Sequence, residues 1–274
     1  MEGFEVLVLW AVVYCVSVSS VPLNEYKTES QLKHVNITID TKYSSYITLS
    51  DVTADELGQY EGGDMIGHIP EMHNGLVDEK FRWQDGVVPY KIVGNFSLEQ
   101  LTKIQQAFHT YHNVTDGCIR FVGRTDQHDY IQVKSNPSGC GSNVGRQGGI
   151  QVVNLQPPGC LYTPGTIQHE FLHALGFHHE QTRWDRDEYV TISWDYMKHG
   201  SEGNFAIHEE DKATGFGFPY DYQSVMHYGS NAFSVNHTAD TITPVDPNAK
   251  IGQRKGLSDI DIAKLKKMYK CDTK

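Results

Sequence analysis

The spacing of hydrophobic residues from residue 83 onward predicts a series of β-strands. Residues 118–122 and 130–133 alternate apolar and polar side chains, which is typical of strands with one buried face, and residues 87–92 also predict a strand. Residues 150–155 form a short apolar run between a glycine pair and a proline pair, which predicts a further strand.

Two segments carry the spacing of amphipathic helices, and each begins with a capping signal. Ser97 followed by Gln100 is a capping box, and apolar residues then recur on one helix face as far as Phe108. Ser258 followed by Asp261 marks the start of a last helix, and the stretch before it has little regular pattern. The order strand, helix, strands, helix predicts an α+β fold.

The first twenty residues have the pattern of a secretory signal peptide. An unbroken apolar run covers residues 6–16, which is too short for a bilayer because a spanning helix needs about 20 residues. Val18 and Ser20 stand at the positions that precede a predicted cut before Val21. We therefore expect a signal peptide over residues 1–20 and a secreted, extracellular protein. No run of about 20 apolar residues follows, so no membrane anchor is expected.

Cysteine and asparagine positions agree with secretion. Once Cys15 is removed with the signal peptide, four cysteines remain, and an even number in an oxidising compartment predicts two disulfides. At this stage all three pairings are open. Four sites for N-glycosylation, usable only in the secretory pathway, stand at Asn36, Asn95, Asn113 and Asn236.

Composition narrows the function in two ways. The formal net charge of -11 argues against nucleic-acid binding, which needs a basic surface. The 14 histidines are numerous, and histidine is a common metal ligand. Most are scattered, but three of them share one short stretch of sequence.

That stretch has the spacing of a metal site. Pro164 suits the first turn of a helix, and His169 and His173 stand four residues apart on it, so their rings project from one face. Gly176 ends the helix because glycine accepts the left-handed conformation, and the turn brings His179 toward the same point. Three histidines leave a fourth position open for water, as in catalytic zinc sites.

Glu170 stands next to the first of these histidines and can reach that water. Zinc lowers the pKa of bound water toward about 7, so a carboxylate can take its proton and pass it to a leaving amine. This chemistry suits hydrolysis of a peptide bond without a serine or cysteine nucleophile. His178 is an alternative third ligand, but the three-residue step from Gly176 favours His179.

The extended motif HExxHxxGxxH marks the metzincin metalloproteases, and this chain resembles their astacin family. Residues 169–187 match the astacin form HExxHxxGFxHExxRxDRD, residues 224–228 match its Met-turn SxMHY, and residues 83–90 match its start region. The likeness covers about residues 60–271. It implies a two-lobed fold, with a twisted, mostly parallel sheet and the active-site helix in the N-terminal lobe. The C-terminal lobe would be largely irregular, with a final helix.

The resemblance also implies roles for individual residues. His169, His173 and His179 would bind one zinc ion, and Glu170 would be the general base. Tyr228 would ligate the zinc at rest and then move to stabilise the tetrahedral oxyanion.

Further expectations follow from the same resemblance. Met226 would form an apolar floor under the zinc, and Glu180 would hold the new N-terminus after activation. The strand at 150–155 would be the upper rim of the cleft, where an extended substrate adds as a strand. The disulfides would pair Cys118 with Cys271 and Cys140 with Cys160.

Astacins are made as zymogens, so the resemblance divides the chain into a signal peptide (1–20), a pro-segment (21–73) and a catalytic domain (74–274). An FxGD motif in the family's pro-segment supplies an aspartate that occupies the zinc. Asp64 is its counterpart here, with one extra residue after the aromatic. His73 precedes the predicted cut, where a trypsin-like activator would need arginine or lysine.

The sequence therefore predicts a monomeric, secreted zinc endopeptidase that hydrolyses proteins or peptides. The alternative is a secreted non-catalytic binding or toxin-like protein on a metalloprotease scaffold. Such proteins usually lose the glutamate or a ligand, and both are present here.

Overall fold

A computed structural model describes residues 60, 62–67, 78–207, 215–236 and 239–273. The predicted signal peptide and most of the predicted pro-segment lie outside the described residues. None of the helices in the described part of the chain combines the length and the apolar character needed to cross a membrane.

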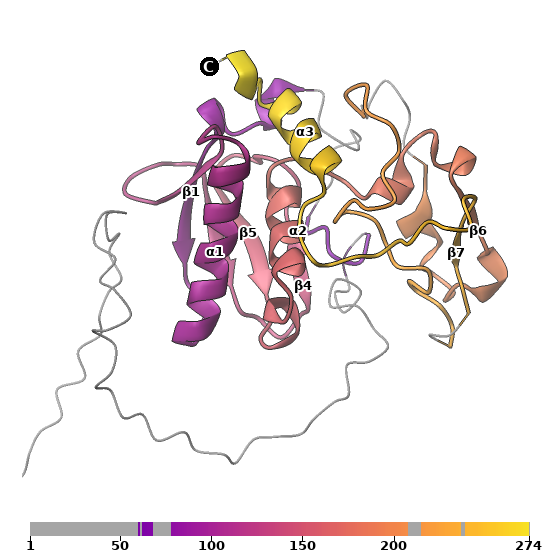
Figure 1. The fold of residues 1–274 in the computed structure, drawn as a ribbon. Helices are drawn as coiled ribbons and strands as arrows, with labels where there is room; N and C mark the ends of the chain where they lie inside the picture. The colour runs from indigo at the N-terminus through magenta and orange to yellow at the C-terminus, as the bar shows by residue number, and fades with distance from the viewer. Residues whose placement is uncertain (1–59, 61, 68–77, 208–214, 237–238, 274) are drawn as a thin grey trace, which may run out of the picture. The chain divides into compact units, whose positions relative to one another are not determined.

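Five strands form a twisted sheet that is parallel except at one edge (Figure 1). In sequence order the strands are β1 (Val87–Ile92), β2 (Arg120–Gly123), β3 (Tyr130–Lys134), β4 (Cys140–Ser142) and β5 (Ile150–Leu155). Their order in the sheet is β2-β1-β3-β5-β4, and only the β4–β5 pair is antiparallel. The expected strands are confirmed, whereas the short β4 was not expected.

Two helices lie side by side over one face of this sheet (Figure 1). Helix α1 (Leu98–Val114) begins with the predicted capping box of Ser97 and Gln100. Helix α2 (Pro164–Ala174) has proline in its first turn, and every residue after that proline is buried. The α1 side chain Tyr111 donates a 2.6 Å hydrogen bond to the carbonyl of Gln168 and so ties the two helices together. Phe108 stacks on Phe121, and Phe171 packs edge-on against both, in the hydrophobic core between the helices and the sheet, which we call the first core.

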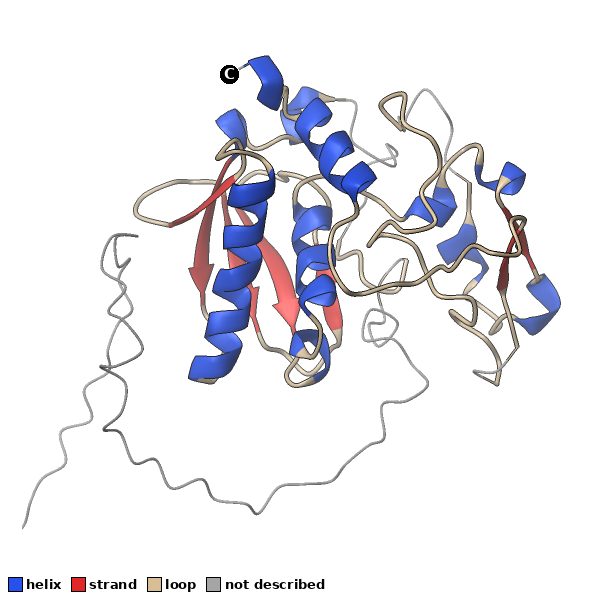
Figure 2. Cartoon of the chain, viewed as in Figure 1, coloured by secondary structure: helices blue, strands red, loops and turns tan. Residues whose placement is uncertain are grey.

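After α2 the chain is mostly loops and short 3₁₀ turns (Figure 2). A small antiparallel sheet joins β6 (Val190–Ile192) to β7 (Ile242–Pro244). Phe205, Phe233 and Tyr228 pack with these strands in a second core. The 3₁₀ turns of the described chain are Glu79–Phe81, Gln84–Gly86, Gly159–Leu161, Glu180–Thr182, Arg186–Glu188, Trp194–Tyr196, Glu202–Phe205 and Cys271–Thr273. The expectation of a largely irregular C-terminal lobe is confirmed.

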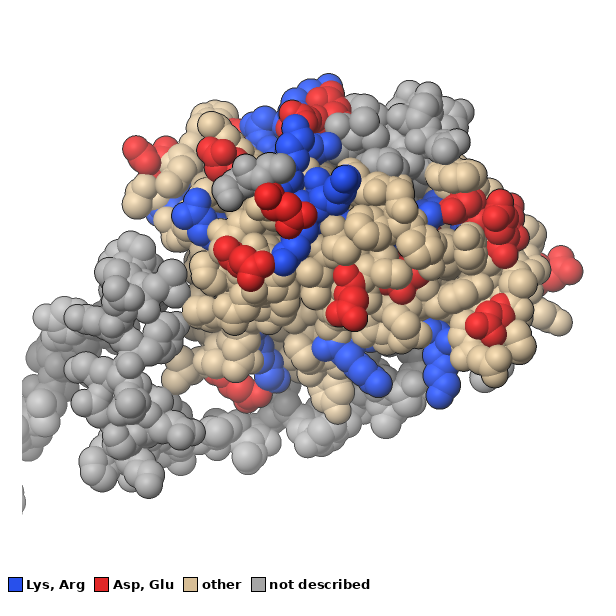
Figure 3. Space-filling view, turned by 45° about the horizontal axis from the view of Figure 1, so that its top comes forward, with Lys and Arg blue, Asp and Glu red and all other residues tan. Residues whose placement is uncertain are grey.

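Helix α3 (Asp259–Met268) closes the chain and begins with the predicted capping box. Its residues Leu265 and Met268 pack into the first core, so the end of the chain returns to the sheet-bearing lobe. Lys266 and Lys267 lie in its last turn, where positive charge is favourable. On the face of the molecule that Figure 3 shows, acidic and basic side chains are interspersed.

Two disulfides fasten the lobe that carries the five-stranded sheet, and both pairings are those expected from the resemblance. Cys118 is bonded to Cys271, which fixes the end of the chain beside β2. Cys140 is bonded to Cys160, which joins the edge strand β4 to the turn before α2.

Candidate metal centre and active site

Helix α2 aims two histidine rings at one point. His169 and His173 are fully buried, and each ring uses Nδ1 to bond a backbone carbonyl, that of Val225 at 2.8 Å and that of Phe177 at 2.7 Å. A carbonyl oxygen can only accept, so Nδ1 carries the proton in both rings. Their Nε2 lone pairs are therefore free to bind a metal, with the tautomers held by neighbouring backbone groups.

The turn after α2 supplies the third ring. Gly176 has a φ of 108°, which a side chain would strain, and the chain reverses there. The turn places His179 beside the helix, with its Nε2 3.3 Å from that of His169. The Nε2 atoms of His169 and His173 are 3.0 Å apart. The predicted convergence of the three histidines is confirmed.

The three nitrogens fit a zinc ion. A tetrahedral site with Zn–N bonds of about 2.0–2.1 Å sets its ligand nitrogens roughly 3.3 Å apart. The observed separations lie close to this value, and buried neutral imidazole is the form that zinc binds. Burial lowers the pKa of His179 to about 4 and also lowers that of His169, so both rings are neutral near pH 7.

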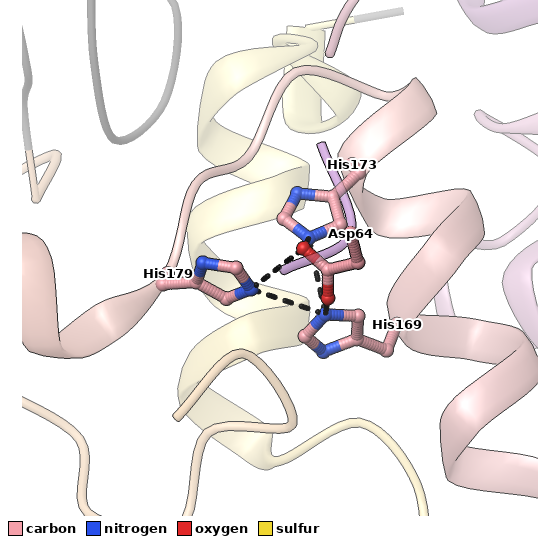
Figure 4. A group of neighbouring side chains, drawn as sticks. All are labelled: Asp64, His169, His173 and His179. Carbon is pink, nitrogen blue, oxygen red and sulfur yellow. Dashed lines mark hydrogen bonds and ion pairs between the residues drawn. The ribbon is translucent and has the colours of Figure 1, made fainter. Parts of the chain in front are cut away.

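Asp64, from the predicted pro-segment, lies against all three histidines (Figure 4). Its Oδ2 lies 2.9 Å from Nε2 of His169, and its Oδ1 lies 3.4 Å from that of His173 and 3.3 Å from that of His179. One ligand atom from each of the four residues lies within 4.8 Å of the others.

The backbone on either side of Asp64 pairs with the edge strand β4. Ser142 donates to the Asp64 carbonyl and accepts from the N–H of Ile66, both at 2.8 Å. The expectation that strand 150–155 is the rim that takes an extended peptide is therefore wrong. That strand, β5, is paired on both edges, with β3 and β4, so the outer edge that bonds residues 64–66 belongs to β4.

Gly141 explains why a peptide backbone can lie so close to β4. A Cβ atom at this position would come within 2.8 Å of the Asp64 carbonyl oxygen and 3.1 Å of the Tyr60 ring. The glycine thus leaves a flat surface for a second strand.

Glu170 and Tyr228 both lie beside the histidines. Glu170 is fully buried on α2 and follows His169 directly. The Tyr228 ring centre lies 4.5 Å from that of His179, and its hydroxyl donates to the carbonyl of Gly62. Its backbone N–H donates to the side chain of Gln181 at 3.1 Å.

Met226 and His178, which were considered for the site from the sequence alone, do not belong to the group of metal-capable side chains. Met226 is buried in the first core, whereas Tyr228, two residues on, belongs to the second core, so the Met-turn joins the two. His178 is buried, but it is not one of the four residues of the metal-capable group among the described residues.

The Met-turn is held by α3, a link that no sequence pattern revealed. Asp261 accepts bonds from the Ser224 hydroxyl at 2.6 Å and the Val225 N–H at 2.8 Å. The Val225 carbonyl in turn accepts from His169. Burial raises the pKa of Asp261 to about 6, although these donors and Ser258 oppose the shift. The sequence showed the capping box of Ser258 and Asp261, but it did not show that Asp261 also bonds the Met-turn.

Glu180 is part of a buried ion-pair cluster. Its carboxylate lies 2.7 Å from Lys264 on α3 and 3.1 Å from Arg183, and it accepts a 3.0 Å bond from the Asp221 N–H. Burial alone would raise the pKa of Glu180, but the two cations bring it below its usual value. Lys264 was not identified from the sequence. Its only signal is that it stands three residues after Asp261, on the same face of α3.

Replacing Lys264 with methionine is expected to lower the free energy of unfolding by about 3 kcal/mol, because it leaves a buried carboxylate with one cation fewer. The loss should be full near pH 7 and smaller near pH 4. The wild-type contribution is complete above the unfolded pKa of about 4.3 and fades as pH falls through the lowered folded pKa. Urea unfolding at both pH values measures it, with Lys267→Met on the exposed face of α3 as control. Equal stability of the two variants would contradict the expectation.

A comparison with family models decides the classification. The model described as Astacin, a peptidase family, matches residues 76–270. The chain belongs to the astacin family. It is therefore a zinc metalloendopeptidase, and its His169, His173 and His179 form the zinc site.

Similar proteins agree with this classification. High choriolytic enzyme 1 of Oryzias latipes is 45% identical over 199 residues, which cover 72% of this chain and 68% of that protein. Zinc metalloproteinase nas-14 of Caenorhabditis elegans is 46% identical over 191 residues, 69% of this chain and 37% of that protein.

Solved structures share the fold of this astacin. The structure of High choriolytic enzyme 1, a hatching enzyme zinc-protease, matches with a TM-score of 0.64 at 44% identity, covering 69% of this chain and 93% of that chain. Myroilysin, at 21% identity and a TM-score of 0.50, covers 69% of this chain and 96% of its own, and shares the fold alone.

Proposed function

We propose that this astacin is made as a secreted, latent precursor whose zinc site is closed by Asp64. The observation that carries the proposal is the contact of the Asp64 carboxylate with all three zinc-binding histidines. Its charge and position are those of a fourth zinc ligand, so the water needed for hydrolysis has no place while Asp64 remains.

The proposal divides the chain into three parts. Residues 1–20 are the signal peptide, residues 21–73 the pro-segment, and residues 74–274 the catalytic domain. Secretion is supported by the two disulfides, which form in oxidising compartments. It is also supported by the exposure of the glycosylation sites at Asn95, Asn113 and Asn236, while Asn36 lies outside the described residues.

After removal of the pro-segment, the groups at the site take the following roles. Zinc, when bound, supplies a Lewis acid that lowers the pKa of water and polarises a carbonyl. Glu170 takes the proton from the attacking water and delivers it to the leaving amine. Tyr228, whose hydroxyl now bonds a peptide carbonyl, is positioned to donate to the oxygen of the scissile peptide as negative charge develops there. The backbone of β4 holds the substrate as an added strand.

The substrates are proteins or peptides that this enzyme cuts as a monomer outside the cell. The names of its relatives, a choriolytic enzyme and a hatching enzyme, support an extracellular protein substrate. The non-catalytic alternative finds no support, because the zinc-binding histidines and Glu170 are all present.

The test compares the folded precursor with the same preparation cut after residue 73. We expect peptide cleavage to rise on cutting and to disappear with a zinc chelator. N-terminal sequencing of the secreted protein locates both cuts, and treatment with a glycosidase shows which asparagines carry sugar. A precursor as active as its cut form would contradict the latent state.

A further inference from the structure

The predicted pro-segment is held next to the metal centre by a side chain outside the zinc-binding motif. The N–H of Gly62 donates a 3.0 Å hydrogen bond to Oδ1 of Asn204, and the Gly62 carbonyl accepts from the Tyr228 hydroxyl. Gly62 is buried, so both of its backbone groups depend on these two partners.

Gly62 marks a point directly beside a zinc-binding histidine. A Cβ atom at this position would lie 3.4 Å from the His179 ring, and the residue has a φ of 62°. The segment that reaches the metal in this structure thus passes both the Asn204 carboxamide and the Tyr228 hydroxyl.

Asn204 and β4 bond this peptide from different parts of the fold. Ser142 on β4 pairs with the backbone of Asp64 and Ile66, whereas Asn204 stands on the 3₁₀ turn Glu202–Phe205. The next residue, Phe205, is fully buried in the second core and packs edge-on against Tyr228, with ring centres 5.7 Å apart. Asn204 itself is half-buried. Because the neighbouring Phe205 is anchored in the second core, the Asn204 carboxamide is held in place before a peptide binds.

We propose that Asn204 is a substrate-positioning residue, which bonds the backbone of the substrate next to the scissile peptide after the pro-segment has left. The inference rests on the proposed function, in which a substrate takes the place of residues 62–66. A carboxamide offers both a donor and an acceptor, so it can bond a peptide N–H or a carbonyl and suits a chain running in either direction. Because it contacts backbone alone, it orients a substrate without selecting a side chain.

The test uses precursor that is folded first and then cut at a specific protease site placed at residues 70–73. The probes are a fluorogenic peptide substrate and a synthetic inhibitor peptide with the sequence of residues 60–67. For Asn204→Ala we expect kcat/KM to fall about tenfold and the inhibition constant of the peptide to rise about tenfold, the size expected for one lost hydrogen bond. Glu202→Ala, exposed on the same turn, is the matched control and should change neither value.

A second peptide, with an ester in place of the amide that contains the Gly62 N–H, separates this bond from a structural effect. The ester should weaken inhibition of the wild-type enzyme about tenfold and cause no further loss in Asn204→Ala, as in a double-mutant cycle. An ester penalty that is absent in the wild type, or the same in both enzymes, would overturn the assigned bond. The wild-type arm decides this even where Asn204→Ala fails to fold.

The remaining outcomes are also distinct. Weaker inhibition with unchanged kcat/KM would overturn the substrate role and leave Asn204 as a pro-segment contact only. A cut wild-type enzyme that holds zinc but cleaves nothing would instead refute the proposed function itself.

Discussion

Glu170→Gln is expected to lower kcat of the cut enzyme by about 10³-fold while leaving zinc binding intact. Glutamine has almost the same shape but cannot accept the proton of the attacking water, and positioned acid–base groups contribute about 10²–10⁴ in rate. The change falls on a fully buried residue of α2 beside His169, so the fold and the three zinc ligands should persist. Steady-state kinetics with a peptide substrate, together with metal analysis, measure both expectations.

The matched control for this variant is Gln168→Glu, which creates a carboxylate one residue before His169. It should not restore activity in a Glu170→Gln background, because positions 168 and 170 lie about 200° apart around the helix axis. Full activity of Glu170→Gln alone would show that another group takes the proton.

Asp64→Ala is expected to raise the peptidase activity of the uncut precursor by at least about 10²-fold. The variant removes the carboxylate that lies within 3.4 Å of all three zinc-binding histidines, so the position needed by the attacking water becomes open. Activity should still lie below that of the cut enzyme, because the backbone of residues 64–66 keeps its bonds to β4. The readout is cleavage of a fluorogenic peptide while electrophoresis shows that the chain remains intact.

Asp78→Ala serves as the control, because it removes an acidic side chain outside the metal site, one that caps a short turn and pairs with Lys80. It should leave the precursor silent. If Asp64→Ala is as silent as the wild type, and both gain equal activity on cutting, the latency must come from the peptide backbone rather than from the carboxylate.

Local sequence signals predicted the parts of the fold that local physics determines. The alternation at 130–133 and the capping boxes at Ser97 and Ser258 each act within a few residues, and the structure has those elements. The histidine spacing worked for the same reason, since residues four apart on a helix share a face wherever the helix packs.

The parts that failed depend on pairing between distant segments. β4 has only three residues, one of them glycine, and becomes a strand because β5 and the segment around Asp64 bond it from both sides. Without β4, the next strand was taken for the rim of the cleft.

Buried charges were equally hidden from the sequence. Apart from the family resemblance, Glu180 is an acid with no sign of burial, and Lys264 is one of several lysines on α3. Their burial is possible only because they meet across 84 positions of sequence, a contact that no periodicity encodes. Asn204 escaped notice for the same reason, because its partner Gly62 lies 142 positions away.

The central claim is that one zinc ion held by His169, His173 and His179 makes this chain a peptidase. The most direct test strips the cut protein of metal and follows peptide cleavage while zinc is added back. The account predicts a linear rise that ends at one zinc per chain, and no recovery in Glu170→Gln at the same zinc content. A protein that takes up one zinc per chain yet cuts no peptide in a broad library would contradict it.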